Sequence, residues 1–459
     1  MSEEVDGVKE GCSSLWSHCR HLILLVSVFS IAAAKSNDFV FTFTVICITG
    51  NSSETEEAVL LTPREVYYAF ASAGVGALLS SLIIALVLDR LGGRIVFPSC
   101  LVLSGLATLS IPFVIRSGLH YLIPLRLMQG IAFAAVMPMV GFISSRWAPL
   151  SEMGNFVTSL TAGIQVSQII TMPLSGELCV RAGWSWSYYI HGLYSIFTAV
   201  LFFSIFRNNP MKHPKMGANE LSKLQKTGPK SSSSVPYASI FRSPAVWGVW
   251  TAFFGNAFGY QTILQFMPTF LNKVLGLAIE RTGFSAILPP LMQLTVKLIG
   301  GILNDRITCI PERRKLQLFN SFAMIGCGLL LLPIGFLPAD PSSSFAAIAL
   351  FSSSVACMGL ITCGSIKSTT LVSRQYSHFV LAIVQFVVCL GYLCVPLFVS
   401  LLAPNNSISE WRRVFIGVFI VLMSTNFVFC YFCEAEAASW TKEKREESSK
   451  SLAEIPREE

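Results

Sequence analysis

The sequence predicts an all-α polytopic membrane protein with twelve transmembrane helices in two six-helix halves and both termini cytoplasmic. Composition is the first observation behind this fold class: of the 459 residues 13% are charged and 53% hydrophobic, and the mean hydropathy is +0.61. An average soluble protein carries roughly 25% charged residues. The second observation is that apolar stretches long enough to span a bilayer recur along the whole chain. The third is a pair of similar charged motifs, one in each half.

Each predicted span is an apolar stretch whose length suits the hydrocarbon core of a bilayer. The first one is too long for the core of a signal peptide and lacks a small-residue cleavage site, so we interpret it as an uncleaved membrane helix. The predicted spans are 21–47, 65–88, 95–115, 120–143, 153–177, 187–206, 244–270, 282–304, 316–337, 345–372, 378–402 and 414–434.

The longest break between spans has the composition of a flexible linker, because it holds the pair Gly228-Pro229 and a serine run that ends at Ser234. The end of the chain is charged and rich in serine, which predicts disorder. The predicted organisation is an N-terminal tail (1–20), a first half (21–206), a cytoplasmic linker (207–243), a second half (244–434) and a disordered cytoplasmic tail (435–459).

The charge distribution predicts the orientation in the membrane. Lys and Arg are concentrated in the tails, the linker and alternate loops, which places these segments in the cytoplasm. Two N-glycosylation sequons, at Asn51 and Asn405, fall in loops predicted to lie on the opposite side. We therefore expect a glycoprotein with both ends inside.

The two halves carry similar motifs at the inner ends of their second helices. The first is DRLGGR (89–94), with Asp89, Arg90 and Arg94, and the second contains Asp305 and Arg306. Such pairs can form charge-assisted hydrogen bonds that break and re-form as two halves rock, which predicts a gating role. The alternative is ordinary positive loop charge. Parallel repeats around a central substrate site are the plan of the major facilitator superfamily.

Several short motifs together resemble one branch of that superfamily, the anion–cation symporters, which comprise sodium-phosphate cotransporters, sialin and vesicular glutamate transporters. Each motif is weak alone, and their order and spacing are specific. The motifs are RLMQG (126–130), RWAPLSE (146–152), MPLSG (172–176), PMKHP (210–214), VPYASIFRSPAVWG (235–248), MPTFL (267–271) and EWRRVF (410–415). The resemblance implies the major facilitator fold and anion transport, with symport as the expected mode.

The chain also departs from the family pattern. In the family an Arg precedes an Asn in the first helix, and Lys35 and Asn37 stand there. A fourth-helix Glu that the family associates with proton coupling is replaced by Phe133. A basic residue of the family's seventh helix aligns with Asn256, and an acidic residue of its tenth helix aligns with Leu371. The chain therefore keeps only some of the residues that the family uses to bind the anion, and it lacks most of the residues associated with ion coupling.

Three charged residues deep in the spans are the main candidates for function. Arg126 is expected to clamp a carboxylate or phosphate with its guanidinium fork, the alternative being a structural pair or snorkelling. Lys35 is a second candidate anion contact, and Asp38 follows it at i+3 on the same helix face. Asp38 is either a titratable gate for ion coupling or a permanent partner of Lys35.

Uncharged polar residues in the first, seventh and eleventh helices either line a substrate cavity or bond between helices. They are Asn37, Asn256, Tyr260, Gln261 and Gln385. Lys297 and Lys367 lie nearer the inner ends of their helices and are interpreted as structural, since both can snorkel.

The sequence argues against several classes of protein. It has no motif of a hydrolase, metalloprotease or P-loop enzyme and no metal-ligand cluster, so we expect no enzyme, no metal and no cofactor beyond a coupling ion such as Na⁺ or H⁺. No basic face interleaved with aromatic residues suggests nucleic acid binding. The cysteines lie mostly in apolar segments, including Cys430 and Cys433, so packing roles and no disulfide framework are expected.

These observations predict a secondary active or facilitative transporter of small organic or inorganic anions (phosphate, carboxylate or acidic sugar) that works by alternating access. One alternative is a transport-inactive receptor or scaffold, and another is a proton-coupled sugar-acid carrier that uses Asp38. The protein is expected to be a monomer in the plasma membrane or in an endolysosomal or secretory vesicle membrane.

Overall fold

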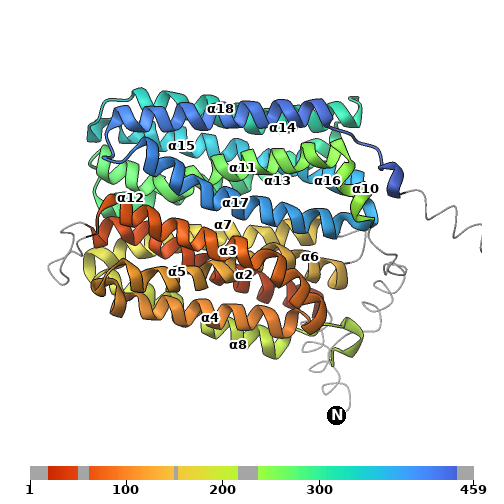
Figure 1. Cartoon of the computed structure of the whole chain (residues 1–459), viewed down its shortest axis with the longest axis horizontal. Helices are drawn as coiled ribbons and strands as arrows, with labels where there is room; N and C mark the ends of the chain where they lie inside the picture. The colour runs from red at the N-terminus through yellow and green to blue at the C-terminus, as the bar shows by residue number, and fades with distance from the viewer. Residues whose placement is uncertain (1–18, 50–60, 149–152, 215–235, 308, 442–459) are drawn as a thin grey trace, which may run out of the picture.

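The computed structural model describes residues 19–49, 61–148, 153–214, 236–307 and 309–441, and within these ranges the secondary structure is helical with no strand. Long helices lie side by side along one direction (Figure 1). We call α2 to α8 the N-terminal bundle and α10 to α18 the C-terminal bundle. In Figure 1 the N-terminal bundle, in red to yellow-green, forms the lower part and the C-terminal bundle, in green to blue, the upper part.

The N-terminal bundle begins with the first described residue. Its helices are α2 (Cys19–Ile48), α3 (Pro63–Leu91), α4 (Gly93–Val114), α5 (Leu119–Ala134), α6 (Val136–Trp147), α7 (Met153–Arg181) and α8 (Trp184–Ile205).

The C-terminal bundle contains more short helices. Its α-helices are α10 (Tyr237–Arg242), α11 (Pro244–Thr269), α12 (Ile279–Ser285), α13 (Leu288–Arg306), α14 (Glu312–Leu331), α15 (Ser344–Met358), α16 (Ser365–Ser373), α17 (Ser377–Leu402) and α18 (Ile408–Phe432). Short 3₁₀ or π turns extend or join the helices of both bundles at Ile115–Ser117, Pro210–Lys212, Phe270–Val274, Leu332–Phe336, Pro341–Ser343, Gly359–Thr362, Arg374–Tyr376 and Ser439–Thr441.

Ten helical stretches among the described residues are long and apolar enough to cross a membrane. The predicted spans 153–177 and 244–270 coincide with α7 and α11, which are not among these ten. The fold is therefore polytopic and helical as predicted, while the count of twelve spans and the cytoplasmic termini stay predictions.

Three predicted spans are each built from two α-helices, and one of them is 345–372, which contains α15 and α16. In the other two, the span 120–143 breaks between α5 and α6, and the span 282–304 breaks between α12 and α13. Pro138 follows the first break, and Pro289 and Pro290 follow the second. Proline has no N–H to donate to the carbonyl four residues earlier, so helix continuity is lost a few residues before each of these prolines.

Both bundles repeat one pattern of helix neighbours. In the N-terminal bundle α3 packs on α5, α4 on α8 and α2 on α7. The corresponding contacts of the C-terminal bundle are α13 with α15, α14 with α18 and α11 with α17. Parallel structural repeats of this kind build the major facilitator fold. The bundles meet where α17 lies on α3, where α2 contacts α11, and where α7 contacts α12 and α13.

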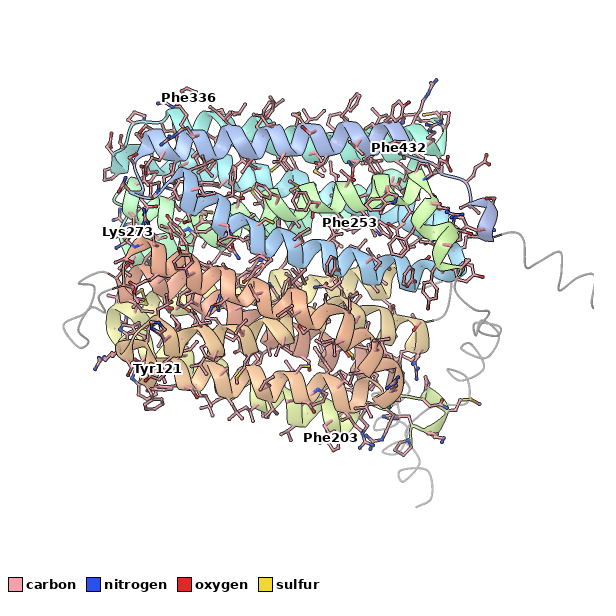
Figure 2. The ribbon with its side chains drawn as sticks, in the orientation of Figure 1. Tyr121, Phe203, Phe253, Lys273, Phe336 and Phe432 are labelled. Carbon is pink, nitrogen blue, oxygen red and sulfur yellow. A yellow bond between two sulfur atoms is a disulfide. The ribbon has the colours of Figure 1, made fainter. Side chains whose placement is uncertain are left out.

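Large apolar side chains cover the outside of the molecule. Figure 2 shows Tyr121 and Phe203 on one long edge and Phe336 and Phe432 on the opposite edge, all of them exposed. A continuous apolar exterior of this extent suits contact with lipid. By contrast, every residue of α2 between Ser30 and Ile48 is buried, so this part of the helix lies inside the protein and not against the bilayer.

Two helices begin with the reciprocal capping box that their sequences encode. At the start of α3 the backbone N–H of Glu65 donates to the Thr62 hydroxyl, and the Thr62 N–H donates to Glu65. At the start of α18 Ser407 and Glu410 make the same exchange. Glu410 also accepts from the side-chain amide of Asn405, the exposed acceptor of the second sequon. Asn51 of the first sequon lies outside the described residues.

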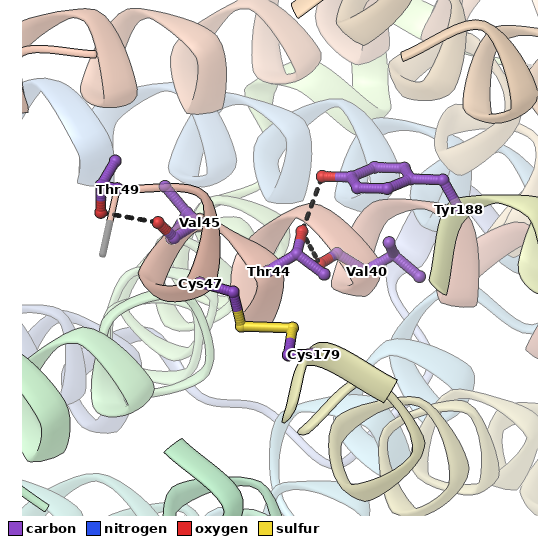
Figure 3. Close-up of a disulfide and its surroundings, with 7 residues drawn as sticks. All are labelled: Val40, Thr44, Val45, Cys47, Thr49, Cys179 and Tyr188. Atoms are coloured by element: carbon purple, nitrogen blue, oxygen red, sulfur yellow. Dashed lines mark hydrogen bonds between the residues drawn. A yellow bond between two sulfur atoms is a disulfide. The ribbon is translucent and has the colours of Figure 1, made fainter. Parts of the chain in front are cut away.

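A disulfide between Cys47 and Cys179 joins the C-terminal ends of α2 and α7 (Figure 3). The expectation that no disulfide is present was therefore wrong for this pair. Their hydrophobic surroundings suggested packing alone, and only the fold brings residues 132 positions apart to a Cα separation of 6.2 Å. Cys430 and Cys433 do not pair with each other, as expected.

The packing of α5 on α3 generates a prediction. A Cβ on Gly130 would overlap the carbonyl oxygen of Ala73, whereas one on Gly141 would meet no atom within 4 Å. We expect Gly130→Ala to destabilise the folded protein by about 1–3 kcal/mol, as overpacking does. The matched change Gly141→Ala is expected to be neutral or stabilising, because Ala favours helix over Gly by up to about 1 kcal/mol.

The melting temperature of the protein in detergent, followed by size-exclusion chromatography after heating, checks this expectation. Equal melting of the two variants would contradict the close approach of α3 and α5.

Candidate functional site

The predicted charged residues meet in the middle of the protein around the carboxylate of Asp38. On α2 the Lys35 ammonium donates to Asp38 Oδ2 at 3.3 Å. The Arg126 guanidinium, on α5, donates from Nη2 to Asp38 Oδ1 at 3.1 Å. The Tyr392 hydroxyl, on α17 of the other bundle, also donates to Oδ1. We call these four residues the charge cluster, and all four are buried.

Arg126 is held on several sides. Its Nε donates to the carbonyl of Ala69 on α3 at 3.2 Å, and its Nη1 donates to Gln129 Oε1 at 2.6 Å. Gln129 in turn donates to the Asn37 carbonyl and to the Thr108 hydroxyl. The side chain is 0% exposed, so Arg126 does not snorkel to a membrane surface.

Aromatic rings enclose Lys35. Its Nζ lies 3.8 Å from the ring centroid of Phe133, 4.7 Å from that of Phe39 and 5.4 Å from that of Tyr392. Ring faces attract a cation through their quadrupole. Phe133 therefore contacts the cluster from the position where the resemblance implied a glutamate, and the carboxylate of the cluster comes from α2 instead.

The charge cluster holds two cations and one carboxylate. Asp38 is the only carboxylate that pairs with Lys35 or Arg126 among the described residues. If the three groups are ionised, the cluster keeps one positive charge that no side-chain anion balances. A buried net charge is costly in a low-dielectric interior, and a bound anion would lower that cost.

The uncharged candidates divide into two sets. Asn37 donates to Ser104 at 3.0 Å, Asn256 to the Met358 sulfur at 3.2 Å and Gln385 to the Cys389 sulfur at 3.2 Å, so these three amides bond within their own bundle.

Tyr260 instead lies between the bundles, where its hydroxyl accepts from Gln168 of α7 and donates to Gln293 of α13. Gln261 is buried and its Oε1 has no hydrogen-bond partner.

The predicted gating motifs are described only in part. Arg90 and Arg306 are exposed, and Arg94 donates from Nε to the Phe203 carbonyl at 3.1 Å. The side chains of Asp89 and Asp305 lie outside the described residues, so the pairing of these motifs stays a prediction.

No sequence motif indicated the ion pairs that lie at the start of α14. Glu312 forms ion pairs with Lys315 at 2.8 Å and with Lys367 at 2.5 Å. The structural interpretation of Lys367 agrees with this contact.

Sequence reasoning missed two members of the site. Gln129 lies in the motif RLMQG, one turn after Arg126, so its place beside the guanidinium could have been found from helical spacing. Tyr392 lies in an apolar helix of the other bundle, and no local signal points to its contact with Asp38. His191 is not part of the site: its Nδ1 lies 2.7 Å from the carbonyl oxygen of Ser187 in its own helix, α8.

The family model of the Major Facilitator Superfamily matches residues 23–378, and the chain belongs to this superfamily. It is accordingly a multi-pass membrane protein of a transporter family and not of an enzyme family.

Within the superfamily, the chain is similar to the anion transporters that its motifs resemble. It is 25% identical to human sialin over 361 residues, which cover 77% of this chain and 72% of that protein. It is 25% identical to vesicular glutamate transporter 2.1 of Danio rerio, covering 77% and 62%. Identity to sodium-dependent phosphate transport protein 3 of Mus musculus is also 25%, covering 82% and 79%. These similarities fall in the branch that the motifs resemble.

Solved structures give the same fold. A bacterial homolog of the human lysosomal transporter Spinster, in an inward-facing and occupied conformation, matches with a TM-score of 0.66 at 14% identity, covering 90% of this chain and 96% of that one. The xylose transporter XylE of E. coli matches with a TM-score of 0.64 at 14% identity over the same shares of the two chains. At this identity the likeness concerns the fold alone.

The charge balance of the cluster generates a stability prediction. Asp38→Asn leaves two buried cations without a carboxylate, and breaking a buried pair in this way costs about 3–5 kcal/mol. Lys35→Met leaves Arg126 and Asp38 as a balanced pair, so we expect a much smaller loss. The double variant should be more stable than Asp38→Asn alone, and melting of the four purified proteins checks the order.

The shared carboxylate is not the main stabilising element of the cluster if Lys35→Met destabilises the protein as much as Asp38→Asn does. The same follows if the double variant loses as much stability as the two single variants together.

Proposed function

We propose that the protein transports small organic or inorganic anions across a membrane by alternating access. One observation carries this proposal: two buried cations share one carboxylate at the junction of two repeated helix bundles. The names of related proteins point the same way, since they include transporters of glutamate and phosphate and a probable exporter of urate. Glutamate, phosphate and urate are all anions.

In this proposal the substrate takes the place that Asp38 occupies. A carboxylate or phosphate would accept hydrogen bonds from Arg126 and Lys35, as a guanidinium fork and an ammonium group readily provide. Asp38 would then lose its cations, and its bond to the Tyr392 hydroxyl would weaken. Because Tyr392 belongs to the other bundle, the exchange links anion binding to the contact between the bundles.

The moving parts would be the halves 21–206 and 244–434, joined by the linker 207–243. The motifs around Asp89 and Asp305 would close and reopen the inner side as the halves rock. Asn256, Tyr260, Gln261 and Gln385 would provide further polar contacts along the substrate path. We place the protein as a monomer in the plasma membrane or in an endolysosomal or secretory vesicle membrane.

Uptake into proteoliposomes tests the proposal. Labelled glutamate, phosphate, urate and sialic acid are offered under an imposed membrane potential to the wild type and to Arg126→Ala. We expect uptake of at least one anion by the wild type and a loss of about 100-fold or more in Arg126→Ala, because a charged hydrogen bond is worth about 1.5–3 kcal/mol and a bidentate clamp supplies two.

Size-exclusion chromatography shows whether Arg126→Ala is folded, and Arg126→Lys serves as the variant that keeps the charge. Flat traces for every anion with folded wild-type protein would contradict the transporter and favour a transport-inactive receptor or scaffold.

A second candidate mode is proton coupling through Asp38, which the structure favours because this carboxylate contacts both cations and the opposite bundle. Protonation of Asp38 would release Lys35, Arg126 and Tyr392 together. If protons are coupled there, uptake by the wild type varies with pH and the variation disappears in Asp38→Asn. Asp38→Glu keeps a titratable group and is the matched control.

Unchanged pH dependence in folded Asp38→Asn would remove this role and leave Na⁺ or the membrane potential as the driving force.

A further inference from the structure

A row of polar side chains runs between the two bundles beside the charge cluster. On α7 the residues Thr161, Gln165 and Gln168 are spaced i, i+4 and i+7, so they share one helix face. Lys297 donates to the Thr161 hydroxyl at 2.6 Å, Gln165 donates to Gln293 at 3.0 Å, and Gln168 donates to Tyr260 at 3.2 Å. We call these six residues the polar seam.

The polar seam begins at the depth of the charge cluster and runs toward the inner side. Ser167, next to Gln168 in sequence, contacts Ser36 at 3.2 Å, and Ser36 is the neighbour of Lys35. Thr161 lies seven residues closer to the start of α7, which is about 10 Å along a helix. The start of α7 lies on the side predicted to be cytoplasmic. Because Lys297 contacts Thr161, it lies about 10 Å closer than the cluster to the side predicted to be cytoplasmic.

Lys297 is an unusual residue for this place. The residue is 8% exposed. Among the described residues the Thr161 hydroxyl is its one hydrogen-bond partner, and no carboxylate pairs with it. A snorkelling lysine would reach the membrane surface, and this one points into the contact between the bundles instead. An ammonium group in a membrane protein interior is costly without a counter-charge, and it has two further N–H groups to donate.

The seam also offers unused acceptors. Gln165 Oε1 and Gln168 Oε1 are buried and have no hydrogen-bond partner. Because a free amide oxygen accepts hydrogen bonds, these positions suit a ligand with donor groups such as hydroxyl or ammonium. The combination of one cation with free amide oxygens fits a carboxylate that carries such donors better than a bare inorganic anion.

We propose that the polar seam is a second binding site for an organic carboxylate bearing hydroxyl or ammonium groups, with Lys297 holding the carboxylate on the inner side of the charge cluster. This proposal rests on the proposed function, because it gives the transported anion a step between the cluster and the inner face. It replaces the structural interpretation of Lys297 made from the sequence.

Uptake of labelled glutamate and sialic acid by the full-length protein in proteoliposomes tests this site, with labelled phosphate for comparison. The variants are Lys297→Gln and the charge-conserving Lys297→Arg. The control is Lys212→Gln, which removes an equal charge from an exposed position outside the interface between the bundles. We expect the concentration for half-maximal uptake of the organic anion to rise about tenfold or more in Lys297→Gln. Lys297→Arg should stay within about threefold of the wild type, and Lys212→Gln should be unchanged.

Melting temperatures measured with and without glutamate or sialic acid separate binding from support of the fold. A merely structural role for Lys297 predicts a lower melting temperature in Lys297→Gln with an unchanged half-maximal concentration, and that result overturns the proposal. Equal effects on phosphate and on the organic anions would overturn the assigned ligand class. Absence of all anion uptake in the wild type would instead contradict the proposed function itself.

Discussion

The buried carboxylate of Asp38 is the group on which the rest of this structure depends. It accepts from an ammonium and a guanidinium of one bundle and from a tyrosine hydroxyl of the other. Without it, two buried cations would have no carboxylate partner in the protein interior, at a cost of several kcal/mol. The same three bonds bring α2, α5 and α17 together, so a single side chain both balances the charge and ties the two bundles.

This arrangement also explains a departure from the family pattern. The resemblance placed a glutamate at the position of Phe133, and its absence suggested that the coupling side was lost. In the fold, Phe133 offers its ring face to Lys35, while the carboxylate enters the same cluster from α2 as Asp38. A carboxylate is thus present at the cluster, and Asp38 of α2 supplies it.

The contacts between the bundles differ in strength from one region to the next. At the charge cluster the hydroxyl of Tyr392 donates to the carboxylate of Asp38, and the Tyr392 ring contacts Phe133 and Lys35. Along the polar seam the contacts are single hydrogen bonds between neutral or singly charged groups. Neutral hydrogen bonds contribute only about 0.5–1.5 kcal/mol each, so the seam can open at modest cost. The Cys47–Cys179 disulfide, in contrast, holds α2 and α7 together within one bundle. Two packed bundles whose interface includes a weakly bonded seam suit a protein that changes the side to which its centre is open.

The sequence by itself determined the polytopic helical class, most helix positions, the superfamily and the identity of Lys35, Asp38 and Arg126 as the charged residues of the interior. These follow from local composition and spacing, which a one-dimensional pattern records. Only the tertiary structure decided that Arg126 meets Asp38 across 88 positions, that Tyr392 meets it across 354, and that Cys47 pairs with Cys179. The physical reason is that an apolar helix carries no mark of which neighbour it will face, because lipid and protein interior favour the same side chains.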